Sequence, residues 1–312
     1  MNYKMITEFD FINKYLVQKE NNSKYSLNFG DDVGVVGDKI YSTDTICEGI
    51  HFFSDDKPYL IAKKLIRVNI SDIVSKGIRP KYCLFNFSAG KNIDEKWISN
   101  FMRGFRSDIN FFKLNLIGGD TIKTSSKTVL SLTIFGSLKN NKFIKRSSAK
   151  NGDHIYVSGT IGDSALGLRF RKSKKINITS QHRKFLLNRY LKPRPRIDLV
   201  NYINKNASAS TDISDGLYDD LMNICVASKL GADINFNKIP LSDSARIFLL
   251  KYPKLSQLIL NGGDDYELLF TGKIGLDKNK NITKIGQMKK GRNINITDFD
   301  DITCFDGYKH KF

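Results

Sequence analysis

The first half of the chain alternates segments of helical and of strand-like apolar spacing. Apolar residues three or four positions apart, which share one face of a helix, occur in residues 57–77 and 94–112. In the first of these segments one side carries Ile66, Ile70, Ile73 and Gly77, and the opposite side carries Lys63, Lys64, Arg67 and Ser71. Apolar runs with β-branched and aromatic residues predict strands at 39–46, 81–88, 114–118 and 127–138.

The second half follows a polar, basic stretch at residues 139–153, which is the best candidate for a domain boundary. We expect strands near 154–159, 232–236 and 267–271, and helices near 163–171, 181–191, 216–229 and 242–251. Neither half shows a strict strand–helix–strand alternation, which favours an α/β protein built as α+β layers over a doubly wound sheet. A length of 312 residues is typical of two domains, predicted here as 1–147 and 148–312.

Composition indicates a folded protein, and its charge raises the question of nucleic acid. Hydrophobic residues make up 40% of the chain and charged residues 26%, while 50 Lys and Arg against 32 Asp and Glu give a net charge of +18. The lysines are scattered, however, and the chain has no basic run of five, no arginine-rich arm and no zinc-finger spacing. We therefore expect no nucleic-acid partner, although a positive field also attracts polyanionic small molecules.

The sequence gives no sign of a membrane span, a disulfide framework or a zinc ribbon. No apolar run approaches the ~18 residues that a span requires, and Glu8 and Asp10 interrupt the N-terminal segment where a signal peptide would be apolar. The four cysteines form no CxxC pair. We expect a cytoplasmic protein.

Aspartates at strand ends and beside glycines are the unusual feature of this basic chain. They are Asp31 and Asp32 after Gly30, Asp44 at a strand end, Asp72 on the first helix, Asp120 after a double glycine, Asp212 and Asp215 around Ser214, and Asp264 and Asp265 after a second double glycine. Each alone reads as a turn residue or an N-cap. Together they favour a shared site, because buried carboxylates are costly unless they are paired or bind a metal. Oxygen ligands of this kind suit Mg²⁺ together with substrate phosphates.

Motifs of the common nucleotide enzymes are missing. The chain contains no GxxxxGK[ST], no GxGxxG opening a helix after a strand, no paired HRD and DFG, and no GxSxG. Of the four histidines only His51, seven residues after Asp44, is a candidate for the site; the others lack ligand spacing. The residues by themselves indicate a magnesium- and phosphate-dependent enzyme outside the common nucleotide folds.

Eight segments in order resemble the thiamine-monophosphate kinase family, which belongs to a superfamily with aminoimidazole ribonucleotide synthetase. The segments are FGDDVGVVG, STDTICEGIHF, NISDIVSKGIRP, LIGGDT, KRSSAKNGDHIYVSGTIGDSALGL, LKPRPRI, STDISDGLYDDL and GGDDYELLF. The resemblance runs from about residue 7 to the C-terminal GYKHKF. The chain departs from the family pattern at Gly34, where Ala is usual, at Asp264, where Glu is usual, and in its tail.

The resemblance implies a two-domain aminoimidazole ribonucleotide synthetase-like fold that dimerises through the sheet of its N-terminal domain. It implies ATP as co-substrate and several Mg²⁺ ions, with metal ligands at Asp31, Ser42, Thr43, Asp44, Asp72, Asp120, Asp212 and Asp215. It implies ATP contacts at Gly119, Asp120, Arg146 and Ser214. It implies contacts to thiamine monophosphate at His51, Asp264 and Tyr308.

The implied reaction is phosphorylation of thiamine monophosphate to thiamine diphosphate, the last step in making that cofactor. A phosphate monoester is mostly a dianion at pH 7, so direct in-line transfer needs no general base. Three superfamily alternatives fit less well: selenophosphate synthetase needs a reactive N-terminal Cys and Lys, the hydrogenase-maturation relative ends in Cys, and aminoimidazole ribonucleotide synthetase lacks the STDTxxEGxHF and GGxDYEL pair.

Overall fold

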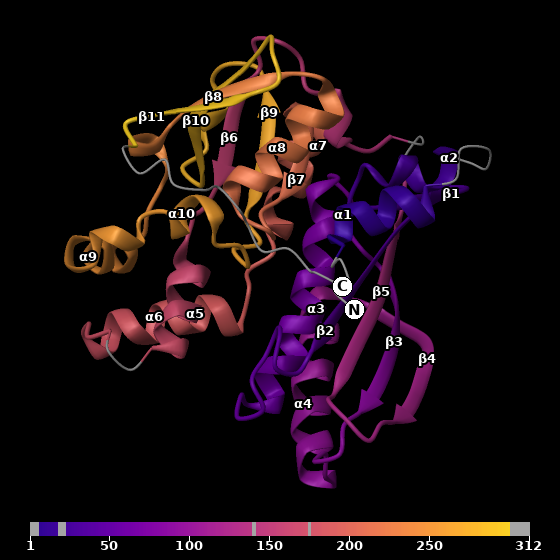
Figure 1. The fold of residues 1–312 in the computed structure, drawn as a ribbon. Helices are drawn as coiled ribbons and strands as arrows, with labels where there is room; N and C mark the ends of the chain where they lie inside the picture. The colour runs from indigo at the N-terminus through magenta and orange to yellow at the C-terminus, as the bar shows by residue number, and fades with distance from the viewer. Residues whose placement is uncertain (1–5, 18–22, 139–141, 174–175, 300–312) are drawn as a thin grey trace, which may run out of the picture.

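Two β-sheets with separate strand orders organise the chain. The computed structural model describes residues 6–17, 23–138, 142–173 and 176–299. The first sheet has the order β1-β2-β5-β3-β4 and the second has the order β11-β8-β10-β6-β9-β7. Figure 1 shows the first sheet in the lower half of the molecule, with α3 and α4, and the second sheet above it, with α8 and α7.

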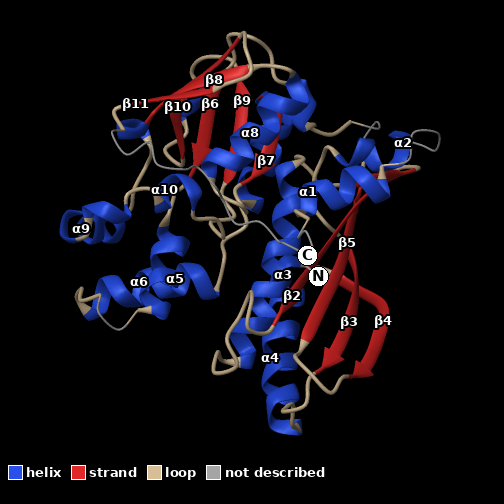
Figure 2. Cartoon of the chain, in the orientation of Figure 1, coloured by secondary structure: helices blue, strands red, loops and turns tan. Residues whose placement is uncertain are grey.

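The first sheet is antiparallel except for its last pair, β3 and β4, which run parallel. Its strands are β1 Gly34–Val36, β2 Lys39–Cys47, β3 Tyr82–Ala89, β4 Asn115–Lys123 and β5 Val129–Ser137. The helices α3 Pro58–Ser75 and α4 Glu95–Phe112 lie along one side of it, and Figure 2 shows no labelled helix on the other side. Strand residues alternate between faces, so Leu130, Leu132 and Ile134 are buried beneath the helices.

The second sheet is mixed, with β11 parallel to β8 and the other pairs antiparallel. Its strands are β6 His154–Ser158, β7 Ala207–Asp212, β8 Gly231–Asn235, β9 Leu268–Gly272, β10 Ile282–Lys289 and β11 Ile294–Thr297. The associated helices are α5 Asp163–Lys172, α6 Ser180–Leu191, α7 Val200–Asn206, α8 Leu217–Ser228, α9 Asp243–Lys251 and α10 Leu258–Asn261.

Short turns complete the chain. Before the first sheet come α1 Glu8–Phe11, the π-helical turn Ile12–Leu16, α2 Ser23–Ser26 and the 3-10 turn Leu27–Phe29. Further 3-10 turns are Arg146–Ser148, Ile197–Leu199, Phe236–Lys238, Pro253–Leu255 and Leu276–Lys278. The boundary predicted between residues 147 and 148 falls inside the first of these five, between the last strand of one sheet and the first of the other.

The predicted α/β layer architecture is confirmed, and so are both long helices. The sequence pattern did not predict the short elements α1, α2, β1 and α10, nor α7, β7, β10 and β11. The strand β7 reads ASASTD, without the β-branched density of a strand, and forms because it pairs with β9 along a buried sheet edge. A bulge between Lys284 and Gly286 interrupts the alternation of β10. Among the helices of the described part of the chain, none is both long and apolar enough to cross a membrane.

The helix α3 is buried on nearly every side. The sequence pattern had suggested one apolar, buried side and one exposed side that carries lysines. Its lysine side is covered as well, since Lys63 and Lys64 are buried. The apolar core around α3 continues into the second sheet, where Leu268 and Phe270 belong to the same cluster. The helix therefore packs between the two sheets, and its polar residues find partners on both.

Candidate active site

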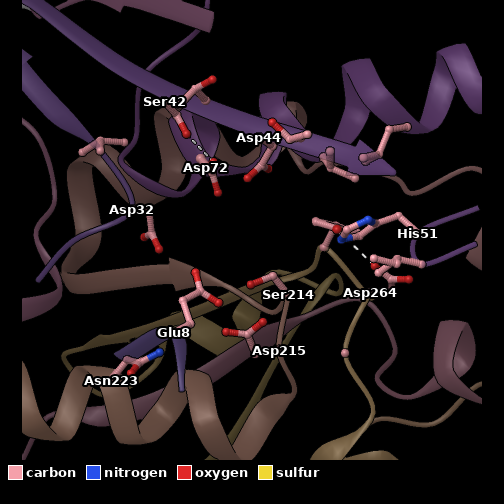
Figure 3. Close-up of a pocket in the computed structure, with 18 of the residues that line it drawn as sticks. Glu8, Asp32, Ser42, Asp44, His51, Asp72, Ser214, Asp215, Asn223 and Asp264 are labelled. Atoms are coloured by element: carbon pink, nitrogen blue, oxygen red, sulfur yellow. Dashed lines mark hydrogen bonds between the residues drawn. The ribbon is translucent and has the colours of Figure 1, made fainter. Parts of the chain in front are cut away.

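A cavity of about 1210 Å³ opens between the two halves of the molecule and is lined from both. Figure 3 shows Ser42 and Asp44 on β2 above it, with Asp72 beneath the strand. Ser214 and Asp215 line the opposite wall, and His51 and Asp264 lie together at the other end. The structure thus brings together residues that lie up to 258 positions apart in the chain, from Glu8 to Tyr266.

Three carboxylates converge at one end of the cavity, which we call the acidic end. Asp32, Asp72 and Asp212 each offer an oxygen, and the three oxygens lie within 4.8 Å of one another. The helix α3 places Asp72 under β2, where it accepts a hydrogen bond from Ser42 Oγ. The neighbouring backbone is fixed by Asn69, whose Oδ1 accepts from the Asp44 amide at 2.9 Å.

The surroundings of Asp44, Asp72 and Asp212 oppose the ionisation of these carboxyl groups. Burial is the largest cause and neighbouring carboxylates add to it, and together they raise the pKa of Asp44 to about 6 and that of Asp212 to about 7. For the same reasons the pKa of Asp72 lies well above its usual range. One oxygen of Asp212, Oδ2, is buried without a hydrogen-bond partner among the described residues.

This donor set fits a divalent cation. Mg²⁺ prefers hard oxygen ligands and keeps open positions for water and substrate phosphates. Carboxylates that resist ionisation when crowded would ionise readily around such a cation, and the orphaned oxygen of Asp212 would gain a ligand. Ser42 and Asp44 lie beside this group on the pocket wall.

The structure separates Asp31 from Asp32, which the sequence could not do. Asp32, not among the predicted ligands, joins Asp72 and Asp212. The predicted ligand Asp31 instead accepts hydrogen bonds or ion pairs from the Arg146 amide at 3.0 Å and from Lys76 Nζ at 2.7 Å. Both carboxylates line the cavity. Adjacent aspartates in a turn carry no spacing signal that tells which one faces a site.

Arg146, a predicted ATP contact, lies in the cavity wall with its guanidinium already engaged. It forms an ion pair with Asp32 and donates to Thr211 Oγ1 at 3.3 Å. Burial disfavours the charge on Asp32, but Arg146 and Lys76 outweigh this effect and lower the pKa of Asp32. The arginine therefore tethers the acidic end to β7 and keeps a positive charge beside the cavity.

A tight turn between β7 and α8 presents Ser214 and Asp215 to the cavity. The carboxylate of Asp220 shapes this turn, because its Oδ2 accepts from the amides of Ser214, Asp215 and Gly216 at 3.0, 3.1 and 3.2 Å. The turn packs against the loop that contains the second double glycine, Gly262 and Gly263. A Cβ at Gly263 would lie 1.8 Å from Ser214 O, so only glycine allows the two loops to approach. Asp220 was not predicted, and its role could have been suspected only from its position in the first turn of the helix.

The two aspartates of the GGDD segment point in different directions. Asp264 faces the cavity and has a positive φ of 68°, which is unusual for a residue other than glycine. Asp265 is buried away from it and accepts from the amides of Gly162 and Ser164 at the start of α5, at 2.6 and 3.3 Å. Burial raises the pKa of Asp265 to about 8 despite these bonds. Asp265 therefore anchors the loop that aims Asp264 at the cavity.

The far end of the cavity, which we call the histidine end, is held by Lys64. This buried α3 side chain donates to Asp264 Oδ2 at 2.9 Å and to the backbone oxygen of His51 at 3.1 Å. It also lies 4.0 Å from the centre of the Tyr190 ring, whose hydroxyl donates to the same His51 oxygen at 3.2 Å. The other oxygen of Asp264 accepts from Tyr266 at 3.1 Å. Lys64 was predicted only as part of a helix face.

Of the remaining predicted site residues, Thr43 lines the cavity. It follows Ser42 on β2, and its Oγ1 accepts a hydrogen bond from Thr133 Oγ1 on β5 at 3.1 Å. Gly119 and Asp120 lie on β4, three strands along from β2, and Asp120 does not line this cavity. Gly119 has its own packing requirement, because a Cβ there would lie 1.8 Å from Phe85 O. Tyr308 lies outside the described residues.

The two-sheet fold with a carboxylate-lined cavity between its halves defines the class of the protein. Residues 30–138 match the family described as AIR synthase related protein, N-terminal domain. The structure also resembles AaThiL complexed with AMPPCP and TMP, with a TM-score of 0.87 and 31% identity, over 99% of this chain and 100% of that one.

Full-length relatives narrow this class to one family. The chain is 36% identical to the thiamine-monophosphate kinase of Buchnera aphidicola subsp. Schizaphis graminum, over 95% of this chain and 91% of that protein. It is 33% identical to the thiamine-monophosphate kinase of Aquifex aeolicus, over 94% and 95% respectively. The chain belongs to the thiamine-monophosphate kinase family.

Proposed function

We propose that this protein transfers the γ-phosphoryl group of ATP to thiamine monophosphate, giving thiamine diphosphate and ADP in the cytoplasm. The family relatives support the reaction, and the neighbouring structure that contains AMPPCP and TMP supports the pair of ligands. The observation that carries the proposal is the cavity itself, with a carboxylate cluster at one end and His51 with Asp264 at the other.

Magnesium would be held at the acidic end. We assign Asp44, Asp72, Asp212 and Asp215 as its carboxylate ligands, add Asp32 to them, and keep Ser42 and the Thr43 backbone as further oxygen donors. We give Asp31 the indirect role of fixing Lys76 and Arg146. When bound, Mg²⁺ neutralises charge on the phosphate oxygens and aligns donor and acceptor. Ser214 and Arg146 would contact ATP from the facing wall.

The acceptor would bind at the histidine end and needs no deprotonation. A phosphate monoester has a second pKa near 6 and is already mostly dianionic at pH 7. His51 Nδ1 accepts from the Cys47 amide at 3.0 Å, so this ring nitrogen is occupied by the protein and not placed as a base. The chain's own contribution is orientation, through His51, through Asp264 and, beyond the described residues, through Tyr308.

A homodimer through the first sheet would complete the site. All nine residues of β4 are exposed, including Leu116, Ile117 and Ile122, which are 47%, 56% and 52% accessible. An apolar edge strand left bare invites pairing with another chain. We therefore assign Gly119 and Asp120 to the cavity of the partner subunit, where Asp120 would be a metal ligand and an ATP contact.

Turnover with defined acceptors tests the function. We expect Mg²⁺-dependent formation of ADP and thiamine diphosphate from ATP and thiamine monophosphate, measured by chromatography of both products. Free thiamine should be a poor acceptor, because its hydroxyl would need a base. Equal or faster turnover of free thiamine would refute the proposal, as would ADP release that does not depend on the acceptor.

Mixing two inactive variants tests the shared site. Asp72→Asn and Asp120→Asn should each be inactive, but after mixing and subunit exchange half of the dimers carry one of each. Each such dimer holds one intact cavity, so the mixture should regain about a quarter of wild-type activity by the symmetry of a dimer. Recovery of no activity, with dimers confirmed by light scattering, would place Asp120 outside the site.

A further inference from the structure

A fully buried lysine adjoins the acidic end. Lys76, directly after α3, has no solvent exposure. Its ammonium forms ion pairs with Asp31 Oδ1 at 2.7 Å and with Asp32 Oδ2, and it donates to the backbone oxygen of Ser210 at 2.9 Å. An ammonium has three hydrogens, and these three acceptors account for all of them.

The contacts of Lys76 join three separate parts of the chain. Asp31 and Asp32 belong to the turn before β1, Lys76 directly follows α3, and Ser210 lies on β7 of the second sheet. A buried ammonium without partners would be very unfavourable, so this geometry is tightly specified.

The charges around Asp32 differ from those around its two neighbours. Asp32 has one oxygen against Lys76 and the other against Arg146, with Thr211 Oγ1 donating at 3.1 Å. Asp72 accepts from Ser42, and Asp212 keeps an oxygen with no hydrogen-bond partner in the described structure. The Asp32 side of the cluster is thus neutralised by the protein, whereas the Asp72 and Asp212 side is not.

We propose that Lys76 is a resident cation of the acidic end, which occupies the place beside Asp31 and Asp32 that a divalent ion would otherwise take. It is a positioning residue: it pairs with Asp31 and Asp32 without metal, so that Asp32 joins the Mg²⁺ site already partly neutralised and the metal is held mainly on the side of Asp72 and Asp212. The proposal rests on the proposed magnesium site. It predicts that the acidic end binds one divalent ion fewer than it would bind if Lys76 were absent.

Metal counting on variants tests this proposal without any turnover. Lys76→Met removes the charge and keeps much of the volume, whereas Lys76→Arg keeps the charge. A matched control is Lys63→Met, since Lys63 is also a buried α3 lysine, paired with Asp108 away from the cavity. The measurements are the number of Mn²⁺ ions bound per chain with AMPPCP, by electron paramagnetic resonance, and the melting temperature in EDTA and in Mg²⁺.

The expected pattern separates a cation role from a purely structural one. In EDTA both Met variants should melt below wild type, because each removes a cationic partner from a buried carboxylate, although Arg67 still pairs with Asp108 and Arg146 with Asp32. Lys76→Met should bind one additional Mn²⁺ per chain and gain several degrees more from Mg²⁺ than wild type does. Lys63→Met and Lys76→Arg should show the wild-type count and the wild-type gain.

Two outcomes would overturn the proposal. If Lys76→Met binds the same number of Mn²⁺ ions as wild type and gains the same melting temperature from Mg²⁺, then Lys76 is only a structural member of a buried ion pair. A Lys76→Met protein that stays unfolded even in saturating Mg²⁺ would show that a metal cannot replace the ammonium. Because thiamine monophosphate is absent from these measurements, failure here is distinguishable from failure of the proposed reaction, which wild-type turnover tests separately.

Discussion

The two ends of the cavity differ in how their buried charges are balanced. At the histidine end the charges are paired within the protein, because Lys64 neutralises Asp264 and also holds the backbone of His51. At the acidic end Asp72 and Asp212 crowd together, and burial with mutual repulsion raises the pKa of both. The carboxylate at the histidine end is neutralised by the protein itself, whereas Asp72 and Asp212 at the acidic end need an added positive charge.

This difference indicates that the two ends contribute differently to the stability of the fold and to the reaction. A preformed histidine end can orient an acceptor without rearrangement, which lowers the entropic barrier of the reaction. A crowded carboxylate cluster instead destabilises the protein without metal, and the same crowding favours cation binding. Substitutions that change the charge at one end at a time should therefore have different effects on stability and on binding.

The largest effect is expected from Asp72→Asn. The change keeps the shape of the side chain and removes one negative charge, so stability without metal should hold or rise as repulsion with Asp44 and Asp212 is relieved. Turnover should fall on the order of a thousandfold, because the electrostatic stabilisation of the transferred phosphoryl group is lost. Melting temperature with and without Mg²⁺–ATP, alongside turnover, provides the check. An early-melting variant with near-normal turnover would remove Asp72 from the site.

A smaller effect should follow from Lys64→Met at the histidine end. Without the ammonium, Asp264 and the backbone of His51 lose a common donor, and the KM for thiamine monophosphate should rise on the order of tenfold. The KM for ATP should change little, and Lys64→Arg should restore part of the loss. Lys63→Met provides the matched control, because it removes a buried lysine from the same helix without touching either end. Parallel increases in both KM values would contradict the separation of the two ends.

His51→Ala should have a weaker effect of the same kind. The imidazole lines the cavity, but its Nδ1 also accepts from the Cys47 amide, so both binding and loop stability depend on it. We expect a several-fold rise in the KM for thiamine monophosphate that exceeds any change for ATP. Unchanged KM values with a lower melting temperature would reduce His51 to a structural residue.

The smallest effect is the part of the pH dependence of stability that arises at the acidic end. Burial, reinforced by nearby carboxylates, raises the pKa of Asp44 to about 6 and of Asp212 to about 7, from 3.8. Between about pH 4 and 7 the folded protein then holds protons that the unfolded chain releases, so these groups make stability decrease as the pH rises.

Saturating Mg²⁺ should weaken this decrease, because the metal stabilises the ionised carboxylates. Asp212→Asn should flatten the curve in EDTA, and urea unfolding at several pH values measures both effects. Asp265→Asn removes another carboxyl group with a raised pKa, of about 8. Its contribution to the pH dependence of stability should not respond to Mg²⁺. Identical slopes for wild type and Asp212→Asn would show that the acidic end is not the source.

Much of the fold was predictable because it follows local spacing. The apolar periodicity of residues 57–77 and 94–112 predicted α3 and α4 within two residues at each end. Strand runs predicted four of the five strands of the first sheet and three of the six strands of the second. The strand β7 could not be predicted in this way, because ASASTD gains its strand conformation from pairing with β9.

The sequence also determined which residue types the site contains, since eight ordered motifs carry its aspartates, Ser42, His51 and Arg146. Tertiary structure alone decided that Asp32, and not Asp31, joins the carboxylate cluster, and that Asp264, and not Asp265, lines the far end of the cavity. It also turned a lysine-bearing helix face inward, where Lys64 reaches Asp264, 200 positions along the chain. Spacing reports neighbours within one helix or strand, whereas the partner of a buried charge is set by how distant segments pack.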